Sequence, residues 1–198
     1  MSTIKLILFF TFITLGFLTK AQSDTLYHIE IHATGSPVIS FFEDERYPGG
    51  SDYSAFGCGM NFRVMWHPGR LLAFGLMSGY LFIVEDEINI NSVLNESQDY
   101  KAKARLNAIP LQLVVSMQKY EFEIGLGMGP YLLLSNIELG RTAQGRRFEL
   151  GLTFFGSYIF PISEQVFIGP ELRVLYLSYR GILSVMPSIT LRINTWSY

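Results

Sequence analysis

Apolar and polar residues alternate along several long segments of the chain. From Tyr120 to Leu134, bulky apolar side chains occupy one row of alternate positions, and glutamate, glycine and tyrosine occupy the other. The same pattern recurs in the segments that begin at Leu72, Arg147 and Val166. A period of two is typical of a β-strand, whose successive side chains point to opposite faces. The pattern therefore predicts an all-β fold.

Turn residues and polar breaks divide the chain into eight predicted strands. They cover residues 27–42, 53–66, 70–84, 104–118, 120–134, 146–160, 166–179 and 182–196. These segments run to about 12–15 residues, whereas strands of globular proteins usually have about 5–6. A tilted strand of about 9–11 residues crosses a bilayer. The predicted strands are therefore long enough to span a membrane.

The two faces of these strands predict which side meets lipid. One face is aliphatic and aromatic, and the other carries glycine, serine and charge, the reverse of a soluble barrel. Short connections at 67–69, 118–119, 161–165 and 180–181 contrast with longer ones at 43–52, 85–103 and 139–145. In lipid every backbone polar group must pair internally, so the sheet has to close. We expect an eight-stranded antiparallel up-and-down transmembrane β-barrel with both termini in the periplasm.

The first residues have the order of a secretory signal peptide. Lys5 precedes an apolar run from Leu6 to Leu18, and small or polar residues follow it. The run is shorter than the roughly 18–20 residues of a spanning helix, which argues against a membrane anchor. We expect cleavage after Ala21, with Ser23 as the alternative. The predicted organisation is a signal peptide over 1–21 and a barrel over 22–198.

Composition narrows the class of protein further. The 198 residues are 49% hydrophobic and 16% charged, with a formal net charge of −2. This length allows one domain, and this hydrophobicity excludes a disordered chain. The net charge argues against nucleic acid as a partner, and the single cysteine excludes an intrachain disulfide. A low charge fraction is what a membrane-embedded wall requires.

The signal peptide, the alternating strands, the loop lengths and the terminal aromatic residues Trp196 and Tyr198 point to a known class. The chain resembles the small eight-stranded outer-membrane β-barrel proteins, the OmpA/OmpX-like barrels of the porin family. The resemblance implies the outer membrane of a Gram-negative envelope and contact with its lipids. It also implies recognition of the last strand by the barrel-assembly machinery, and it implies no cofactor. Strict alternation places Trp196 and Tyr198 in the inward row, so we expect a bulge or register shift near the end.

Four prolines fall inside predicted strands, namely Pro110, Pro130, Pro170 and Pro187. Proline cannot donate a ladder hydrogen bond, and a closed barrel has no free edge on which to place it. We therefore expect these residues at bulges or at parts of strands above the lipid.

The inward face supplies the candidate site. We place ten polar residues there: Glu30, Arg63, Gln112, Glu121, Glu123, Glu149, Glu171, Arg173, Arg192 and Asn194. An eight-stranded barrel is just wide enough for side chains to fill it, and charges removed from water tend to pair. The pattern favours a structural salt-bridge network. A narrow polar conduit or a ligand pocket is the alternative.

The histidines do not by themselves predict a metal site. His28 and His32 flank Glu30 in the sequence HIEIH. On a strand they lie roughly 13 Å apart, too far to chelate one ion. His67 precedes a Pro-Gly pair, where a role in the turn is sufficient. Cys58 falls in the lipid-facing row. The sequence therefore predicts no metal ligands.

No nucleotide-binding loop, CxxC or HExxH motif is present. We therefore expect a non-enzymatic barrel with a structural or binding role through extracellular loops, of which 85–103 is the longest, or a narrow channel. One alternative is a lipid-modifying outer-membrane enzyme, similar to lipid A deacylases, that would use His28 or His32. Another is a soluble secreted barrel that binds a small apolar ligand. The sequence identifies no extracellular partner.

Overall fold

The computed structural model describes residues 27–42, 53–54, 56–68, 71–89, 101–139, 141–178 and 181–197. The predicted signal peptide over 1–21, the first long loop and residues 90–100 of the second long loop lie outside this set. The described residues include no helix with the length and hydropathy needed to cross a membrane.

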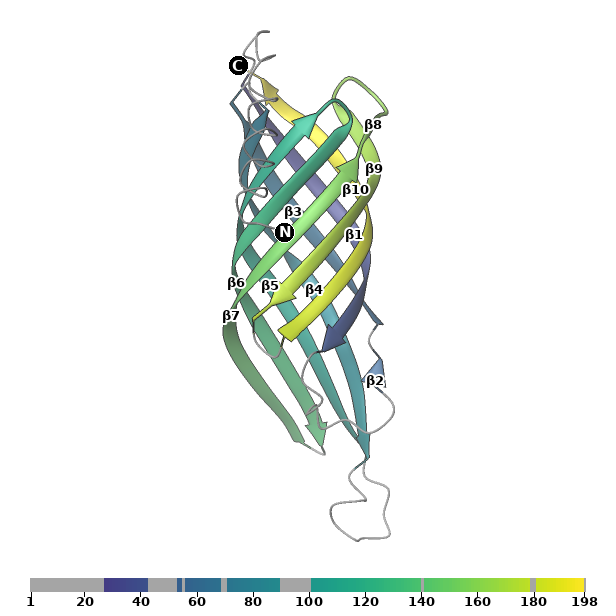
Figure 1. Ribbon diagram of the computed structural model, residues 1–198. Coiled ribbons are helices and arrows are strands. Elements are labelled where there is room, and N and C mark those ends of the chain that lie inside the picture. The colour runs from purple at the N-terminus through teal and green to yellow at the C-terminus, as the bar shows by residue number, and fades with distance from the viewer. Residues whose placement is uncertain are drawn as a thin grey trace, which may run out of the picture.

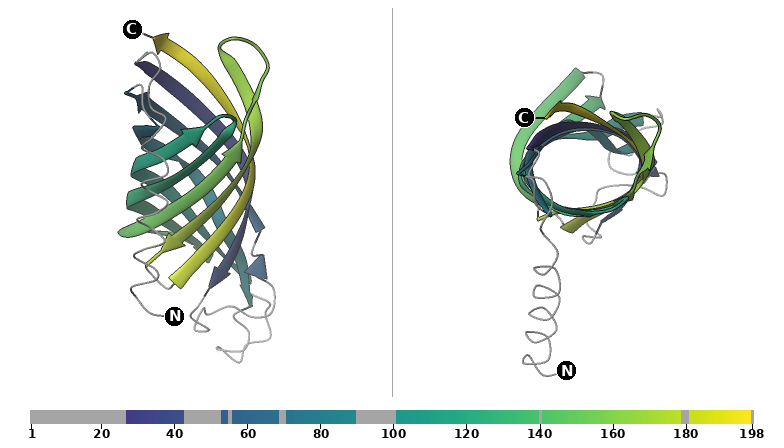
Figure 2. Two further views of the ribbon diagram at one scale, coloured as in Figure 1. Left: turned by 45° about the horizontal axis from the view of Figure 1, so that its top comes forward. Right: turned by 90° about the horizontal axis from the view of Figure 1, so that it is seen from above.

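The described chain forms one closed antiparallel sheet (Figures 1 and 2). Its strands are β1 (His28–Phe42), β2 (Tyr53–Ser54), β3 (Phe56–His67), β4 (Leu72–Asn89), β5 (Lys101–Lys119), β6 (Phe122–Leu139), β7 (Arg141–Tyr158), β8 (Phe160–Pro161), β9 (Val166–Leu177) and β10 (Ile182–Ser197). The neighbours run in the order β10-β1-β3-β4-β5-β6-β7-β9, and β9 also pairs with β10. The two-residue strands β2 and β8 pair with β4 and β9. The predicted eight-stranded up-and-down barrel is confirmed.

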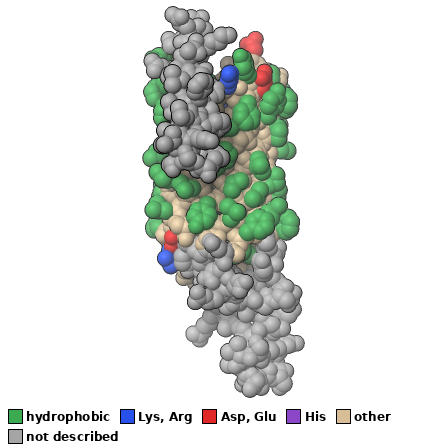
Figure 3. All heavy atoms as spheres, in the orientation of Figure 1, with side chains coloured by type: hydrophobic (Ala, Val, Ile, Leu, Met, Phe, Trp, Pro, Cys, Tyr) green, Lys and Arg blue, Asp and Glu red, His purple; other side chains and the backbone are tan. Residues whose placement is uncertain are grey.

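Side chains alternate between the two faces along most of the wall. In β3, every second residue from Phe56 to Trp66 is exposed and the residues between them are mostly buried. On the outside, Leu113, Leu150 and Ile189 are 68%, 67% and 65% exposed. Apolar side chains cover the visible wall between charged groups at its two ends (Figure 3). A continuous apolar belt of this size is an interaction surface for hydrocarbon rather than for water.

The barrel has two different ends. We call the end where β1 begins and β10 finishes the terminal end, and the opposite one the loop end (Figure 1). At the terminal end, β5 and β6 are joined by Tyr120 and Glu121. The sequence placed this turn at 118–119, two residues too early. Tyr120 has a φ of 56°, and a left-handed residue suits a two-residue hairpin turn because it matches the twist of the strands.

At the loop end, two hairpins are longer than predicted. The ladder of β4 with β5 continues from Glu85↔Arg105 to Asn89↔Lys101. The ladder of β6 with β7 continues to Leu139↔Arg141. The expected loops 85–103 and 139–145 are therefore wrong in extent. These segments carry few bulky apolar residues, so alternation gives only a weak signal there, and pairing between strands holds them instead.

The ladders are interrupted beside the four prolines that fall inside the predicted strands. The β1–β10 ladder skips from Gly35↔Ile189 to Ile39↔Val185. Ladders break in this way beside Pro187 in β1–β10, Pro110 in β4–β5 and Pro130 in β5–β6, and the β7–β9 ladder ends next to Pro170. The prolines are accommodated because the backbone around them does not pair on one side.

The expected irregularity near the C-terminus is a bulge in β10. Ile29 pairs with Trp196 but Glu30 pairs with Asn194, so Thr195 is the extra residue. The Thr195 hydroxyl donates to the carbonyl of Ile29 at 2.9 Å. The bulge brings the backbone of Trp196 into register with Ile29. Tyr198 lies outside the described residues.

The interior is layered along the barrel axis. An apolar cluster fills the half toward the loop end, with members Val38, Leu81, Ile83, Val84, Ala108, Tyr131, Leu133, Leu175, Leu177, Ile182 and Met186. A smaller one, of Met65, Ala73, Met77, Val114 and Phe155, lies in the half toward the terminal end, together with the ionic groups. Ile83 and Val84 are both buried because the β4–β5 register shifts between Phe82 and Val84. Alternation alone did not predict this apolar filling.

Candidate functional site

Glu171 joins two arginines inside the barrel. Its Oε2 accepts a hydrogen bond from Nη2 of Arg63 at 2.7 Å, and its Oε1 accepts one from Nε of Arg173 at 3.1 Å. The three residues are at most 2% exposed. Glu171 and Arg173 project from β9, and Arg63 reaches them from β3. A buried charge requires a close partner, and here one carboxylate serves two guanidinium groups.

Arg63 continues the network to His32. Its Nη2 lies 3.1 Å from Nδ1 of His32, and its guanidinium covers the Phe155 ring at 4.0 Å. Arginine only donates hydrogen bonds, so Nδ1 of His32 accepts this one. Nε2 of His32 contacts Oε2 of Glu30 at 3.1 Å. Both imidazole nitrogens are therefore occupied, and neither is available to activate a nucleophile.

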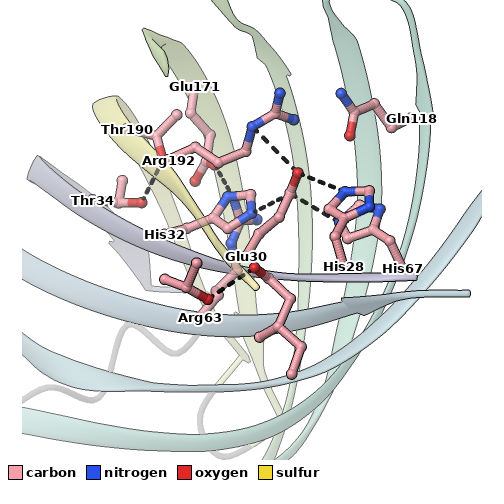
Figure 4. Close-up of polar contacts among 12 residues, drawn as sticks. His28, Glu30, His32, Thr34, Arg63, His67, Gln118, Glu171, Thr190 and Arg192 are labelled. Carbon is pink, nitrogen blue, oxygen red and sulfur yellow. Dashed lines mark hydrogen bonds and ion pairs between the residues drawn. The ribbon is translucent and has the colours of Figure 1, made fainter. Parts of the chain in front are cut away.

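The network ends at the terminal end in a group that we call the Glu30 cluster, formed by His28, Glu30, His67 and Arg192 (Figure 4). Nε2 of His28 lies 3.1 Å from Oε1 of Glu30, and Nε2 of His67 lies 2.8 Å from Oε2. Nε of Arg192 is 3.7 Å from Oε1. With His32, one carboxylate thus faces four nitrogen-bearing side chains from three strands.

The register of the strands explains this meeting. His28 and His67 are directly opposite in the β1–β3 ladder. Their rings stack with centroids 4.4 Å apart and planes inclined by 10°. Glu30 follows His28 by two residues, so its side chain projects from the same face of β1.

A cavity of about 310 Å³ lies beside the cluster. It is lined by His28, Glu30, His67, Gln118, Tyr120, Arg192 and Asn194. Tyr120 is 81% exposed in the β5–β6 turn, so the cavity reaches the terminal rim. The Oδ1 atom of Asn194 is buried and has no hydrogen-bond partner among the described residues. The cavity is therefore polar and has unused hydrogen-bonding capacity.

The ten residues predicted to face inward differ in how far they are buried. Seven are buried: Glu30, Arg63, Gln112, Glu123, Glu171, Arg173 and Arg192. Asn194 is half-buried at the cavity, and Glu149 is half-buried toward the loop end, where it pairs with Arg147. Glu121 is exposed. Its inward placement is wrong because β6 begins only at Phe122, which leaves Glu121 in the turn.

Two buried polar residues stay outside the ionic chain. Gln112 donates from Nε2 to the carbonyl of Gly151 at 3.4 Å. Neither carboxylate oxygen of Glu123 forms a hydrogen bond with a described residue.

Sequence reasoning missed the place of His67. It assigned this residue to the turn, whereas the structure has it as the last residue of β3, with 4% of its surface exposed. Only the register of the β1–β3 pairing, which sets His67 opposite His28, would have revealed this position. The sequence does not reveal that register, because the connecting segment 43–55 contains no recognisable turn pattern.

No protein-family model and no curated protein matches the chain. Among solved structures, Neisserial surface protein A is 14% identical, over 84% of this chain and 97% of that one, with a TM-score of 0.48. Ail of Yersinia pestis, in complex with the heparin analogue sucrose octasulfate, is 11% identical over 86% and 100%, with a TM-score of 0.47. The outer membrane protease OmpT from Escherichia coli is 8% identical over 89% and 100%, with a TM-score of 0.39. The likeness concerns the fold alone, and the assignment of an eight-stranded barrel rests on the closed ladder of the chain's own strands.

Proposed function

We propose that the chain is an integral outer-membrane barrel with a sealed lumen, and that its binding surface is the sheet that projects from the loop end. Export by the predicted signal peptide over 1–21 fits this location. The apolar belt supports insertion into lipid and argues against a soluble ligand-binding barrel. An even number of strands places both termini in the periplasm. The terminal end then faces the periplasm, and the loop end faces the outside.

The interior supports a closed lumen. The apolar cluster fills the half toward the loop end, and Tyr131 within it is 1% exposed. Its hydroxyl is 2.8 Å from the hydroxyl of Thr153 on β7. The ionic chain from Arg173 to Glu30 occupies the other half. An eight-stranded barrel filled by side chains leaves no aqueous path.

We expect the purified barrel to show no single-channel conductance above background in planar bilayers. A variant with Leu81, Tyr131 and Leu177 all replaced by alanine removes much of the apolar cluster and serves as the positive control. Resolved conductance steps from the unmodified protein would show that the lumen is open and would restore the channel alternative.

The proposed binding role rests on the edge of the projecting sheet. Strands β4 to β7 continue past the ends of β1, β9 and β10 (Figure 1). β7 pairs with β9 only from Gly151 onward. Between Arg141 and Leu150, its only ladder among the described residues is the one with β6. On its other side, hydrogen bonds from Ser178 to the carbonyl of Leu150 close the segment at the membrane. Toward Arg141 no other described strand pairs with it, so we infer an open strand edge outside the membrane.

Such an edge recognises extended polypeptide. Unpaired backbone N–H and C=O groups along a strand edge are a template for an added strand. Arg146 and Arg147 lie on this segment and are exposed, and Arg147 also pairs with Glu149. The arginines favour an acidic partner strand. The sheet is rigid enough to serve as a template because its four strands are continuous with the barrel wall.

The binding proposal can be tested with reduced, carboxymethylated α-lactalbumin, an acidic and extended polypeptide. We expect saturable binding to the barrel in nanodiscs, and loss of most of it in Ala143→Pro, because proline disrupts the edge. Glu164→Pro, in the exposed turn at the opposite end, is the matched control and should bind normally. Equal binding by both variants, or no binding by the unmodified chain, would contradict the proposal. Heat-modifiable gel migration verifies that each variant is folded.

A non-enzymatic role is part of the same proposal. The lipid-modifying alternative needs an activated histidine near the outer leaflet. His28 and His32 lie instead toward the terminal end, and both ring nitrogens of His32 already have partners. This placement favours a role for these histidines in the interior network.

A further inference from the structure

The Glu30 cluster holds three side chains with the chemistry of a metal site. His28, Glu30 and His67 each offer one ligand atom, and these atoms lie within 4.8 Å of one another. We propose that they bind a divalent transition-metal ion of the zinc class at the periplasmic mouth of the barrel. This site is independent of the projecting sheet, which lies at the opposite end.

The donor atoms are already close to the spacing that an ion requires. The two imidazole Nε2 atoms lie 3.1 Å and 2.8 Å from the two oxygens of Glu30. Zinc binds nitrogen at about 2.0–2.1 Å and carboxylate oxygen at about 2.0–2.2 Å, so ligand atoms around a tetrahedral ion are roughly 3.3 Å apart. The three donor atoms lie within 4.8 Å of one another, so rotation of the imidazole side chains has to bring the pair that is farthest apart to this shorter spacing.

The backbone provides the preorganisation. His28 and His67 are opposed in a paired ladder, and their Nε2 atoms lie 3.1 Å and 2.8 Å from the carboxylate oxygens of Glu30. The two rings are stacked nearly parallel, so at least one of them has to turn before both nitrogen lone pairs point at one ion. A second layer of contacts holds that carboxylate, because His32 bonds Oε2 and is itself held by Arg63. Outer partners of this kind orient the ligands of metal sites.

Two histidines and one carboxylate leave coordination positions unfilled. The cavity beside them supplies space for water, and the buried amide oxygen of Asn194 has no hydrogen-bond partner among the described residues. Imidazole and carboxylate together suit zinc, nickel, cobalt and copper rather than magnesium or calcium. A metal binds the unprotonated nitrogen of an imidazole, so binding displaces any proton at Nε2 of either histidine, and no electron transfer is involved.

The positive charge of Arg192 opposes binding of the ion. Its Nε is 3.7 Å from Oε1 of Glu30, and its guanidinium covers the Phe167 ring at 4.4 Å. A positive charge at this distance weakens cation binding. The metal and Arg192 compete for one carboxylate, so removal of the arginine charge should tighten binding.

The test uses the mature chain without a histidine tag, refolded in detergent and titrated with Zn²⁺ in a calorimeter. We expect one ion per barrel, and a loss of affinity of more than about 100-fold in His28→Ala and in His67→Ala. Arg192→Gln should bind Zn²⁺ more tightly than the unmodified chain. Co²⁺ should give the visible absorption bands of a low-coordinate site, which a nonspecific surface ion does not give.

The matched control is Ser184→Ala, which changes a buried residue near the loop end, far from the cluster. It should bind Zn²⁺ as the unmodified chain does. Heat-modifiable migration identifies any variant that has failed to fold, and such a variant is replaced by His67→Gln. Absence of saturable Zn²⁺ binding by the unmodified chain, or binding unchanged in both histidine variants, would overturn the proposal.

Discussion

Glu171→Ala is expected to lower the free energy of unfolding by about 3–5 kcal/mol, the cost of removing one partner from a buried ion pair. The carboxylate is the shared acceptor of Arg63 and Arg173, both of which are at most 1% exposed. Its loss leaves two guanidinium groups side by side in the barrel without a counter-charge. Reversible urea unfolding in detergent micelles, followed by tryptophan fluorescence, measures the change.

Glu85→Ala is the matched control for this experiment. Glu85 also faces two cations, with Oε2 3.2 Å from Nε of Arg105 and Oε1 3.9 Å from Nζ of Lys103. Its side chain is 30% exposed, on the projecting sheet. Solvent screens such pairs, so the expected cost is below about 1 kcal/mol. A cost for Glu171→Ala no larger than that for Glu85→Ala would show that the interior network does not stabilise the barrel.

Gly169→Ala is expected to destabilise the barrel by about 3 kcal/mol or more, at the upper end of the cost of overpacking. A Cβ atom at this position would lie 1.8 Å from the carbonyl oxygen of Tyr158 and 2.9 Å from Cα of Ile159. Both neighbours are backbone atoms, which cannot turn away as a flexible side chain can. The substitution therefore pushes β9 away from the end of β7 and opens the wall. The urea midpoint and the folded fraction on unheated gels report the effect.

Gly35→Ala is the control for the glycine experiment. A Cβ atom at Gly35 meets nothing within 4 Å, and the residue is exposed on β1. Alanine in a strand loses less conformational freedom on folding than glycine does, so this variant should be as stable as the unmodified chain or more stable by about 0.5–1 kcal/mol. If both variants unfolded at the same urea concentration, close packing at Gly169 would not be the reason for its glycine.

The alternation of apolar and polar residues predicted the strands of the barrel wall but not all of their ends. Alternation identified every long strand, because the pleat of one strand decides which of its own side chains face lipid. It failed for the hairpins beyond the rim, which carry few bulky apolar residues, so that only pairing between strands shows that Glu85 and Arg105 belong to a ladder. It also placed Glu121 inside, because the turn could not be located to the residue.

The candidate site was only partly predictable for a related reason. Most of the buried ionic residues follow from the inward row of each strand. Their partners do not, since the contact of Arg63 with Glu171 crosses the lumen and the contact of His67 with Glu30 joins two strands. The sequence indicated that His28 and His32 lie too far apart to share an ion. It did not show that His67 would stand beside His28.

The sequence by itself determined the all-β class, the number of strands and the apolar exterior, because each depends on residues close together along one strand. The tertiary structure decided the rest: the bulge at Thr195 that resolves the register of the last strand, the apolar filling of one half of the lumen, and the meeting of His28, Glu30 and His67 at its other end. Register and closure are properties of pairs of strands. A shift of one residue between β1 and β3 would reverse which side chains share a face, and the pattern within either strand would remain unchanged.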